Sequence, residues 1–187
     1  MQGLLSNPHR LGIRGITFQL VADRRGKDPG VFRNCHEILR SSIRLFRYAL
    51  VVFDREGCGS RENRETLELA TERRLGQNGW NYRCAAVVVD PELEAWVWSE
   101  SPHVCTVLGW SLTPDELRAT LEQANYLIRS HAKPHRPKDA LDHILRLSQK
   151  RHSSALFLEL AQRVSFEQCK DPSFLKLKAT LRNWFGR

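Results

Sequence analysis

Two short apolar runs that lead directly into acidic residues constrain the fold of this chain more than any other feature. Residues 48–53 are rich in valine and are followed by Asp54 and Glu56, and residues 84–89 are followed by Glu92. Continuous apolar runs of this length are typical of strands that are buried on both faces of a parallel sheet. The segment between the two runs has room for one helix, which is the connection that neighbouring parallel strands need. The sequence therefore predicts a strand–helix–strand unit.

Flanking segments extend this unit to an α/β core over residues 1–100. Residues 13–22 alternate apolar and polar side chains, which is typical of a strand, and residues 31–46 carry apolar side chains at helical spacing. A charged helix is predicted from 61 to 76, between the two apolar strands. This order favours a mostly parallel sheet flanked by helices.

The second part of the chain, residues 101–187, is predicted to be helical. Thr113 precedes Pro114 and Glu116. A capping threonine, a first-turn proline and a third-position glutamate predict a helix that begins there and runs to about residue 131. Other predicted helices cover residues 137–150, 153–163 and 172–184, and a short one follows Pro91.

The composition suits a soluble chain with a polyanionic partner. The formal net charge is +8, and residues 131–187 alone contain 12 Lys or Arg against five Asp or Glu. A basic region beside an acidic site favours nucleic acid as the partner, although a solvated helix surface explains the same charges. No apolar run is long enough to span a membrane, no signal-peptide pattern is present, and the five cysteines form no CxxC pair. We expect a cytoplasmic protein without a disulfide framework.

Several stretches of the sequence together resemble a known bacterial family. They are RRGKDPGVFRN at 24–34, ALVVFDREG at 49–57, DPELEAWVW at 90–98, KDALDHIL at 138–145 and CKDPSFLKLKATL at 169–181. Their order is similar to that in the uncharacterised TOPRIM-related proteins known as domain of unknown function 4276. The most specific piece is ELEAW at 92–96, followed by the late helical segment that contains Asp171.

This resemblance implies a TOPRIM-like α/β fold with a divalent metal site. Such domains place a glutamate after a first strand and an acidic pair after a later strand, and these residues hold Mg²⁺ for phosphodiester chemistry in topoisomerases, primases and nucleases of antiviral defence. This chain departs from the pattern at two points. Its acidic pair is Asp54-Arg55-Glu56, and no glutamate precedes Glu37. Residues 1–11 look like the end of the helix that should follow the first strand. Either the chain starts late, or the site is incomplete, or another subunit supplies the missing ligand.

Asp54, Glu56 and Glu94 are the predicted catalytic and metal-binding residues, and Glu92 is a further predicted ligand of Mg²⁺ or Mn²⁺. On a helix Glu92 and Glu94 would point about 200° apart, so only one of them would face the site. Glu94 is favoured because it lies within the ELEAW sequence. The structural alternatives stay open: a carboxylate after a strand also stabilises turns, and first-turn acids are favoured by the helix dipole.

The predicted contacts to nucleic acid are Lys27, Arg55, Arg61 and Lys138. Lys27 follows Gly26, which permits close approach of a phosphate to the backbone, and the two arginines flank the acidic pair. An exposed loop lysine and arginines paired with nearby glutamates are the structural alternatives. The function that the sequence favours is a metal-dependent nuclease of a phage-defence system. The alternative is a non-catalytic TOPRIM-like scaffold or nucleic-acid sensor within a multiprotein defence complex. Nucleic acid and other defence proteins are the expected partners, and a homodimer is left open.

Overall fold

The computed structural model describes residues 1–23, 25–99, 101, 103–164 and 169–186. The chain has a mixed α/β fold and divides into two compact units. The sheet unit comprises Phe18–Leu93 and Pro172–Trp184, and the helical unit comprises Met1–Thr17, Glu94–Asp171 and Phe185–Arg187. The last helix thus belongs mainly with the strands, whereas the sequence places it in a helical part that begins at residue 101.

The sheet unit contains the predicted strand–helix–strand arrangement. β1 (Ala49–Asp54) and β2 (Cys84–Val89) pair in parallel, in a register that sets Ala49 opposite Cys84. The helix α4 (Arg64–Leu75) connects the two strands and packs against β2. Its start is stabilised by a cap, since an asparagine side chain just before the helix accepts a backbone hydrogen bond from the first turn. This part of the prediction is confirmed.

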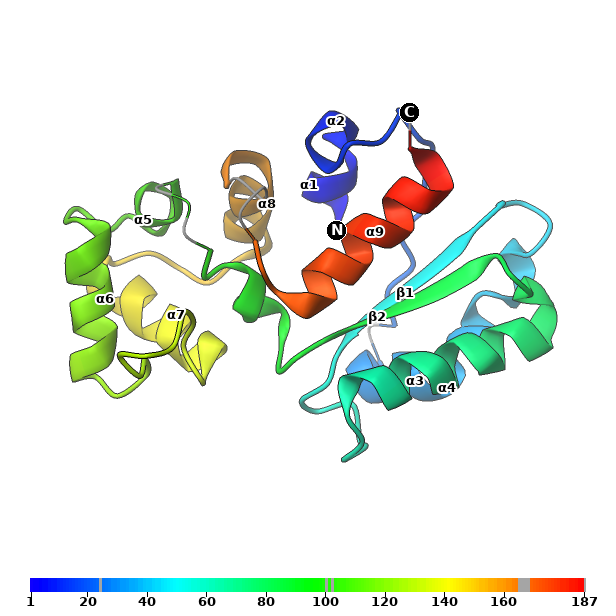
Figure 1. Cartoon of the computed structure of the whole chain (residues 1–187), viewed down its shortest axis with the longest axis horizontal. Helices are drawn as coiled ribbons and strands as arrows, with labels where there is room; N and C mark the ends of the chain where they lie inside the picture. Colours follow the sequence, from blue (N-terminus) through cyan, green and yellow to red (C-terminus); the bar gives the residue numbers. More distant parts are fainter. Residues whose placement is uncertain (24, 100, 102, 165–168, 187) are drawn as a thin grey trace. The chain divides into compact units, whose positions relative to one another are not determined.

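Two helices cover one side of the strands. α3 (Lys27–Ile38) packs on β1 and against α4, and Figure 1 shows α3 and α4 on the same side of the two strands. Val51 and Phe53 of β1 are buried in a cluster with Leu67 of α4. The sequence predicts one helix over 31–46, but α3 begins earlier and ends at Ile38. A separate 3₁₀ turn, η1, follows at Arg40–Ser42. The last helix of the chain is α9 (Pro172–Phe185).

Carboxylates of α4 satisfy the outer edge of β2. Glu68 accepts a hydrogen bond from the backbone N–H of Val88 at 3.0 Å, and Glu72 accepts one from Ala86 at 2.9 Å. The ammonium of Lys176 in α9 lies 3.1 Å from Glu68 and 2.8 Å from Glu72. Glu68 is only 3% exposed. Because a buried strand N–H needs an acceptor, side chains here take the place that a third strand would fill.

The predicted strand over residues 13–22 is wrong. Ile13 forms a single bridge with Gly186, and the described residues 14–22 have no regular secondary structure. Leu20 and Val21 are each 50% exposed. Alternating apolar and polar residues form a strand only where a neighbour takes up the backbone hydrogen bonds and covers the apolar face. The segment has the alternation but not that neighbour.

The helical unit is built from short helices. They are α1 (Gln2–Leu5), α2 (Pro8–Leu11), α5 (His103–Leu108), α6 (Pro114–Gln123), α7 (Pro137–Leu147) and α8 (Ser154–Arg163), and the 3₁₀ turn η3 (Leu93–Trp96) leads into the unit. The predicted start of α6 is confirmed: Thr113 and Glu116 exchange side-chain and backbone hydrogen bonds in a capping box. The helix ends at Gln123 instead of near residue 131, because Asn125 takes a left-handed φ of 57°. Among the described residues, no helix has the length and apolar character needed to cross a membrane.

Candidate functional site

The carboxyl ends of β1 and β2 carry a group of acidic residues. Asp54 ends β1, Glu56 lies two residues beyond it, and Asp90 follows β2 directly. The two strands remain joined past their ends, since the backbone N–H of Glu56 donates to the carbonyl of Pro91 at 2.9 Å. Open α/β sheets bind ligands at this end of their strands. We call Asp28, Asp54, Glu56 and Asp90 the acidic edge.

Asp28 is the member of the acidic edge that sequence reasoning missed. It lies in the first turn of α3, and its Oδ1 accepts a hydrogen bond from the backbone N–H of Asp54 at 3.2 Å. The contact joins residues that are 26 positions apart, so no local spacing indicates it. The available signal was Asp28-Pro29 at a helix start after Gly26, a pattern that marks a first helical turn beside the strand ends. Asp28 thus brings a second carboxylate to the end of β1.

Arg55 is bound within the acidic edge. Its Nε donates to Oδ1 of Asp90 at 2.7 Å, and this hydrogen bond raises the pKa of the Arg55 guanidinium above its ordinary value. The pair joins the end of β1 to the end of β2. Arg55 therefore neutralises one carboxylate of the edge, while Glu56 remains exposed to solvent.

The predicted metal ligands are divided between the two units. Asp54, Glu56 and Glu92 belong to the sheet unit, whereas Glu94 belongs to the helical unit. Glu94 is buried, and its Oε1 lies 3.7 Å from Nε2 of His152. Oxygen-rich carboxylate groups suit Mg²⁺ and Mn²⁺, but among the residues that the structure describes, no three His, Cys, Asp or Glu side chains are grouped to hold an ion. The described residues thus show no metal-binding group, and the predicted ligand set stays a prediction.

Two of the stretches that carry the family resemblance meet in the helical unit. Trp96 of the ELEAW sequence donates from Nε1 to Oδ1 of Asp171 at 3.3 Å. Lys133 donates to Oδ2 of Asp171 at 2.9 Å and to the carbonyl of Ala95 at 2.8 Å. Asp171 is 7% exposed, so its charge is compensated inside the protein. These residues have a structural role in joining η3 to the segment before α9, and sequence reasoning missed Lys133.

A second feature of the sheet unit lies at the opposite end of β1. The connection between α3 and β1 carries Arg40, Arg44 and Arg47, and all three side chains are exposed. We call these three arginines the basic connection. None of the ion pairs in the described part of the chain involves them. β1 has six residues. At about 3.3 Å per residue the basic connection lies roughly 20 Å from the acidic edge.

Hydrogen bonds from Arg83 fix the backbone of the basic connection. The Arg83 guanidinium donates to the carbonyls of Ile43, Phe46 and Arg47 at 3.2 to 3.4 Å, and to that of Gly79 at 3.1 Å. One half-buried cation therefore satisfies several carbonyls of an irregular segment. The exposed arginines are consequently presented on a segment whose backbone is fixed.

An aromatic pair adjoins the basic connection. The rings of Tyr48 and Trp184 stack with centroids 4.6 Å apart and planes 9° apart. The guanidinium of Arg47 lies over the Tyr48 ring, 5.3 Å from its centroid. This arrangement fixes the direction of Arg47 by a cation–π contact. The R-x₃-R-x₂-R spacing at 40–47 was the sequence signal for this surface.

The predicted nucleic-acid contacts come from both units. Lys27 begins α3 and is exposed, and Arg61 is exposed just before α4. Lys138 is exposed near the start of α7 in the helical unit. Arg55 is engaged with Asp90, as described above. The comparisons add no further guide: no family model, no curated protein and no solved structure matches the chain.

Proposed function

We propose that this protein binds the phosphate backbone of nucleic acid through the basic connection and acts as a non-catalytic, TOPRIM-like component of a phage-defence complex. The observation that carries the binding is the set of Arg40, Arg44 and Arg47, which are exposed, outside the ion pairs of the described chain and held on a fixed segment. The TOPRIM-like class and the defence setting rest on the resemblance of the sequence stretches alone.

Physical chemistry supports a phosphate ligand at this surface. Arginine offers donors in a planar fork that matches phosphate oxygens, and it stays charged at any physiological pH. Three such groups with no carboxylate partner lose little on binding a polyanion, because no existing ion pair has to break. The fixed backbone also reduces the entropy lost when the complex forms. Backbone binding of this kind is independent of nucleotide sequence.

The test measures salt dependence of binding with a matched control. Fluorescence anisotropy would give the affinity of the full chain for a labelled duplex between about 50 and 200 mM salt, where phosphate contacts are strongly weakened. In the variant with Arg40, Arg44 and Arg47 all changed to alanine, the slope of log K against log salt should be shallower by about 3, at roughly 0.9 per phosphate contact. In the control variant, alanine replaces three exposed arginines of the helical unit, Arg129, Arg151 and Arg163. This variant loses the same positive charge.

The two variants distinguish specific phosphate contacts from an effect of net charge. A loss confined to the first variant supports specific contacts at the basic connection. Equal loss in both variants would mean that net charge alone drives binding, and the proposal would be rejected. Binding by the wild type that is unchanged by EDTA supports the non-catalytic function.

A metal-dependent nuclease is the second candidate, and the contact of Asp28 with Asp54 favours it. This contact adds a carboxylate at the end of β1, in a sequence in which no glutamate precedes Glu37. Since the described residues show no complete metal site, this function requires a ligand beyond the groups that they bring together. Calorimetric titration with Mn²⁺ of the wild type and of Asp54→Asn would test it. Micromolar binding that disappears in Asp54→Asn, together with EDTA-sensitive cleavage, would establish the nuclease and overturn the non-catalytic proposal.

A further inference from the structure

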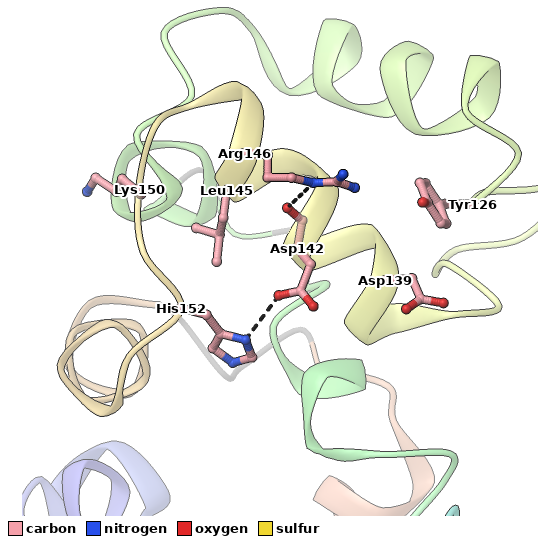
Figure 2. Close-up of a pocket in the computed structure, with 7 residues that line it drawn as sticks. All are labelled: Tyr126, Asp139, Asp142, Leu145, Arg146, Lys150 and His152. Atoms are coloured by element: carbon pink, nitrogen blue, oxygen red, sulfur yellow. Dashed lines mark hydrogen bonds and ion pairs between the residues drawn. The ribbon is translucent and has the colours of Figure 1, made fainter.

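A polar pocket lies in the helical unit, whereas the acidic edge and the basic connection belong to the sheet unit. The pocket has a volume of about 460 Å³ and is lined by Tyr126, Asp139, Asp142, Leu145, Arg146, Lys150 and His152. α7 supplies one wall, the turn after α6 supplies the tyrosine, and the segment between α7 and α8 supplies the histidine (Figure 2). The volume falls within the range of small-molecule sites.

The acidic groups of the pocket lie on one face of α7. Asp139 and Asp142 are three residues apart, so their side chains are neighbours on the helix surface. Oδ1 of Asp142 lies 3.0 Å from Nδ1 of His152, and this contact fixes the position of both side chains. Asp139 pairs with Arg136, which does not line the pocket. Each carboxylate thus has one protein partner and keeps acceptor capacity for a ligand.

The basic group that reaches the pocket is Arg146. Its Nε donates to the backbone carbonyl of Asp142 at 3.4 Å, and Figure 2 shows its terminal nitrogens pointing toward the side of the pocket where Tyr126 lies. Lys150 points away from Asp142, and its ammonium donates to the carbonyl of Val107 at 2.8 Å. Arg146 is therefore the cation that a ligand in this pocket would meet.

The side chains restrict the chemistry of a ligand. A simple anion would be repelled by Asp139 and Asp142, and a simple cation would be repelled by Arg146. A fitting ligand carries N–H donors at one end and an anionic group at the other. The ring of Tyr126 is half-buried, with its centroid 5.3 Å from that of His143, and it lines the pocket, so it favours a flat aromatic group between these ends. A nucleotide has this distribution of donors, planar ring and phosphate.

We propose that the pocket binds a guanine nucleotide, with the base against Tyr126, its donor edge on Asp139 and Asp142, and its phosphate on Arg146. Among the bases, guanine presents a ring N–H beside an exocyclic amine, which is the pair of adjacent donors that a carboxylate accepts. The choice of a nucleotide rests on the nucleic-acid binding proposed above. The ligand is either a free guanosine monophosphate or an unpaired guanosine of a single strand.

Calorimetric titration with the four ribonucleoside monophosphates tests the base preference. The full chain should bind guanosine monophosphate about tenfold more tightly than adenosine monophosphate, the factor expected for one good pair of base contacts. Arg146→Ala should weaken binding about tenfold by removing the phosphate contact. Asp142→Asn should abolish the preference for guanine, since an amide offers a donor where the carboxylate offers an acceptor.

The matched control is Arg151→Ala. Arg151 is exposed, lies next to His152 in sequence and does not line the pocket, so this variant loses the same charge as Arg146→Ala. It should bind guanosine monophosphate like the wild type. Circular dichroism of each variant would confirm an intact fold. Equal weakening by Arg151→Ala, or a guanine preference that survives Asp142→Asn, would overturn the assignment.

A second arm separates the two sources of the nucleotide. An oligothymidylate that contains one guanosine would be compared with the same oligonucleotide without it, in wild type and in Asp142→Asn. A preference for the guanosine that depends on Asp142, without binding of the free monophosphate, assigns an unpaired base of a single strand. No preference in either form of the ligand would overturn the proposal. The variant with Arg40, Arg44 and Arg47 changed to alanine should bind the free monophosphate like the wild type. Failure of the pocket assignment can therefore be distinguished from failure of the proposed backbone binding.

Discussion

Replacement of Glu68 by alanine tests whether side chains on α4 complete the edge of β2. The carboxylate of Glu68 is 3% exposed and accepts hydrogen bonds from Val88, Arg64 and Lys176. Its removal leaves the N–H of Val88 without its acceptor in a buried position, which costs about 1–3 kcal/mol. Breaking a fully buried ion pair costs about 3–5 kcal/mol, but Lys176 is 28% exposed and keeps Glu72 as a partner, so that cost is strongly reduced. We expect a loss of about 3 kcal/mol.

Two measurements check this magnitude. Urea unfolding would give the change in the free energy of unfolding, and hydrogen exchange would report directly on the amide of Val88. A loss of about 3 kcal/mol corresponds to protection that falls by about 100-fold. The matched control is Glu65→Ala on the same helix, because Glu65 also pairs with Arg64 but is exposed. Its ion pair is screened by solvent, so its loss should lower the free energy of unfolding much less than the loss of Glu68. Equal effects of the two replacements, or unchanged exchange at Val88, would refute the reasoning.

Three further predictions concern single groups. Burial, and then a neighbouring carboxylate, raise the pKa of Cys84 to about 11. Mass spectrometry should therefore show that Cys84 is alkylated at pH 9 more slowly than a free thiol. Because the thiol of the unfolded chain ionises first, the free energy of unfolding should fall as the pH rises above 9. Hydrogen bonds from Thr113 lower the pKa of Glu116. The capping box therefore stabilises α6 fully above the ordinary carboxyl pKa, and this stabilisation is lost as the pH falls through the lowered pKa. Amide exchange in α6 would detect the loss. Asp171→Ala removes the partner of Lys133 and should destabilise the helical unit by about 3 kcal/mol in urea, against less for Asp171→Asn.

The parts of the fold that the sequence predicts well are those fixed by local patterns. Both strands were placed to within one residue because each is a continuous apolar run, and the start of α6 was found because capping depends on neighbouring residues. The strand expected at 13–22 failed because strand formation requires a partner elsewhere in the chain. Alternation alone carries no information about that partner.

The roles of residues in the candidate sites are harder to predict, because they depend on contacts between distant parts of the sequence. Glu68 and Glu72 look like the exposed charges of a surface helix, and only their contacts with β2 reveal that they are structural. Glu94 was predicted to bind a metal, and no local spacing in the sequence indicates its contact with His152. Asp28 was missed for the same reason, since its contact with Asp54 spans 26 positions. The metal-ligand and nucleic-acid assignments themselves stay predictions.

Because α9 belongs to the sheet unit, folding of this unit during synthesis is completed only after the last helix has been translated. Lys176 lies 108 positions after Glu68, so the strands and α4 leave the ribosome long before their compensating ammonium exists. Until then the carboxylates of Glu68 and Glu72 stand at the edge of β2, and among the described residues that precede α9 their paired cation is Arg64, which binds Glu68. A nascent chain that stops at Leu93 has the apolar core of the sheet unit but an unbalanced negative edge. Translation of the final helix is therefore the step that completes the sheet unit, and truncation before Pro172 should leave it incompletely folded even though both strands are present.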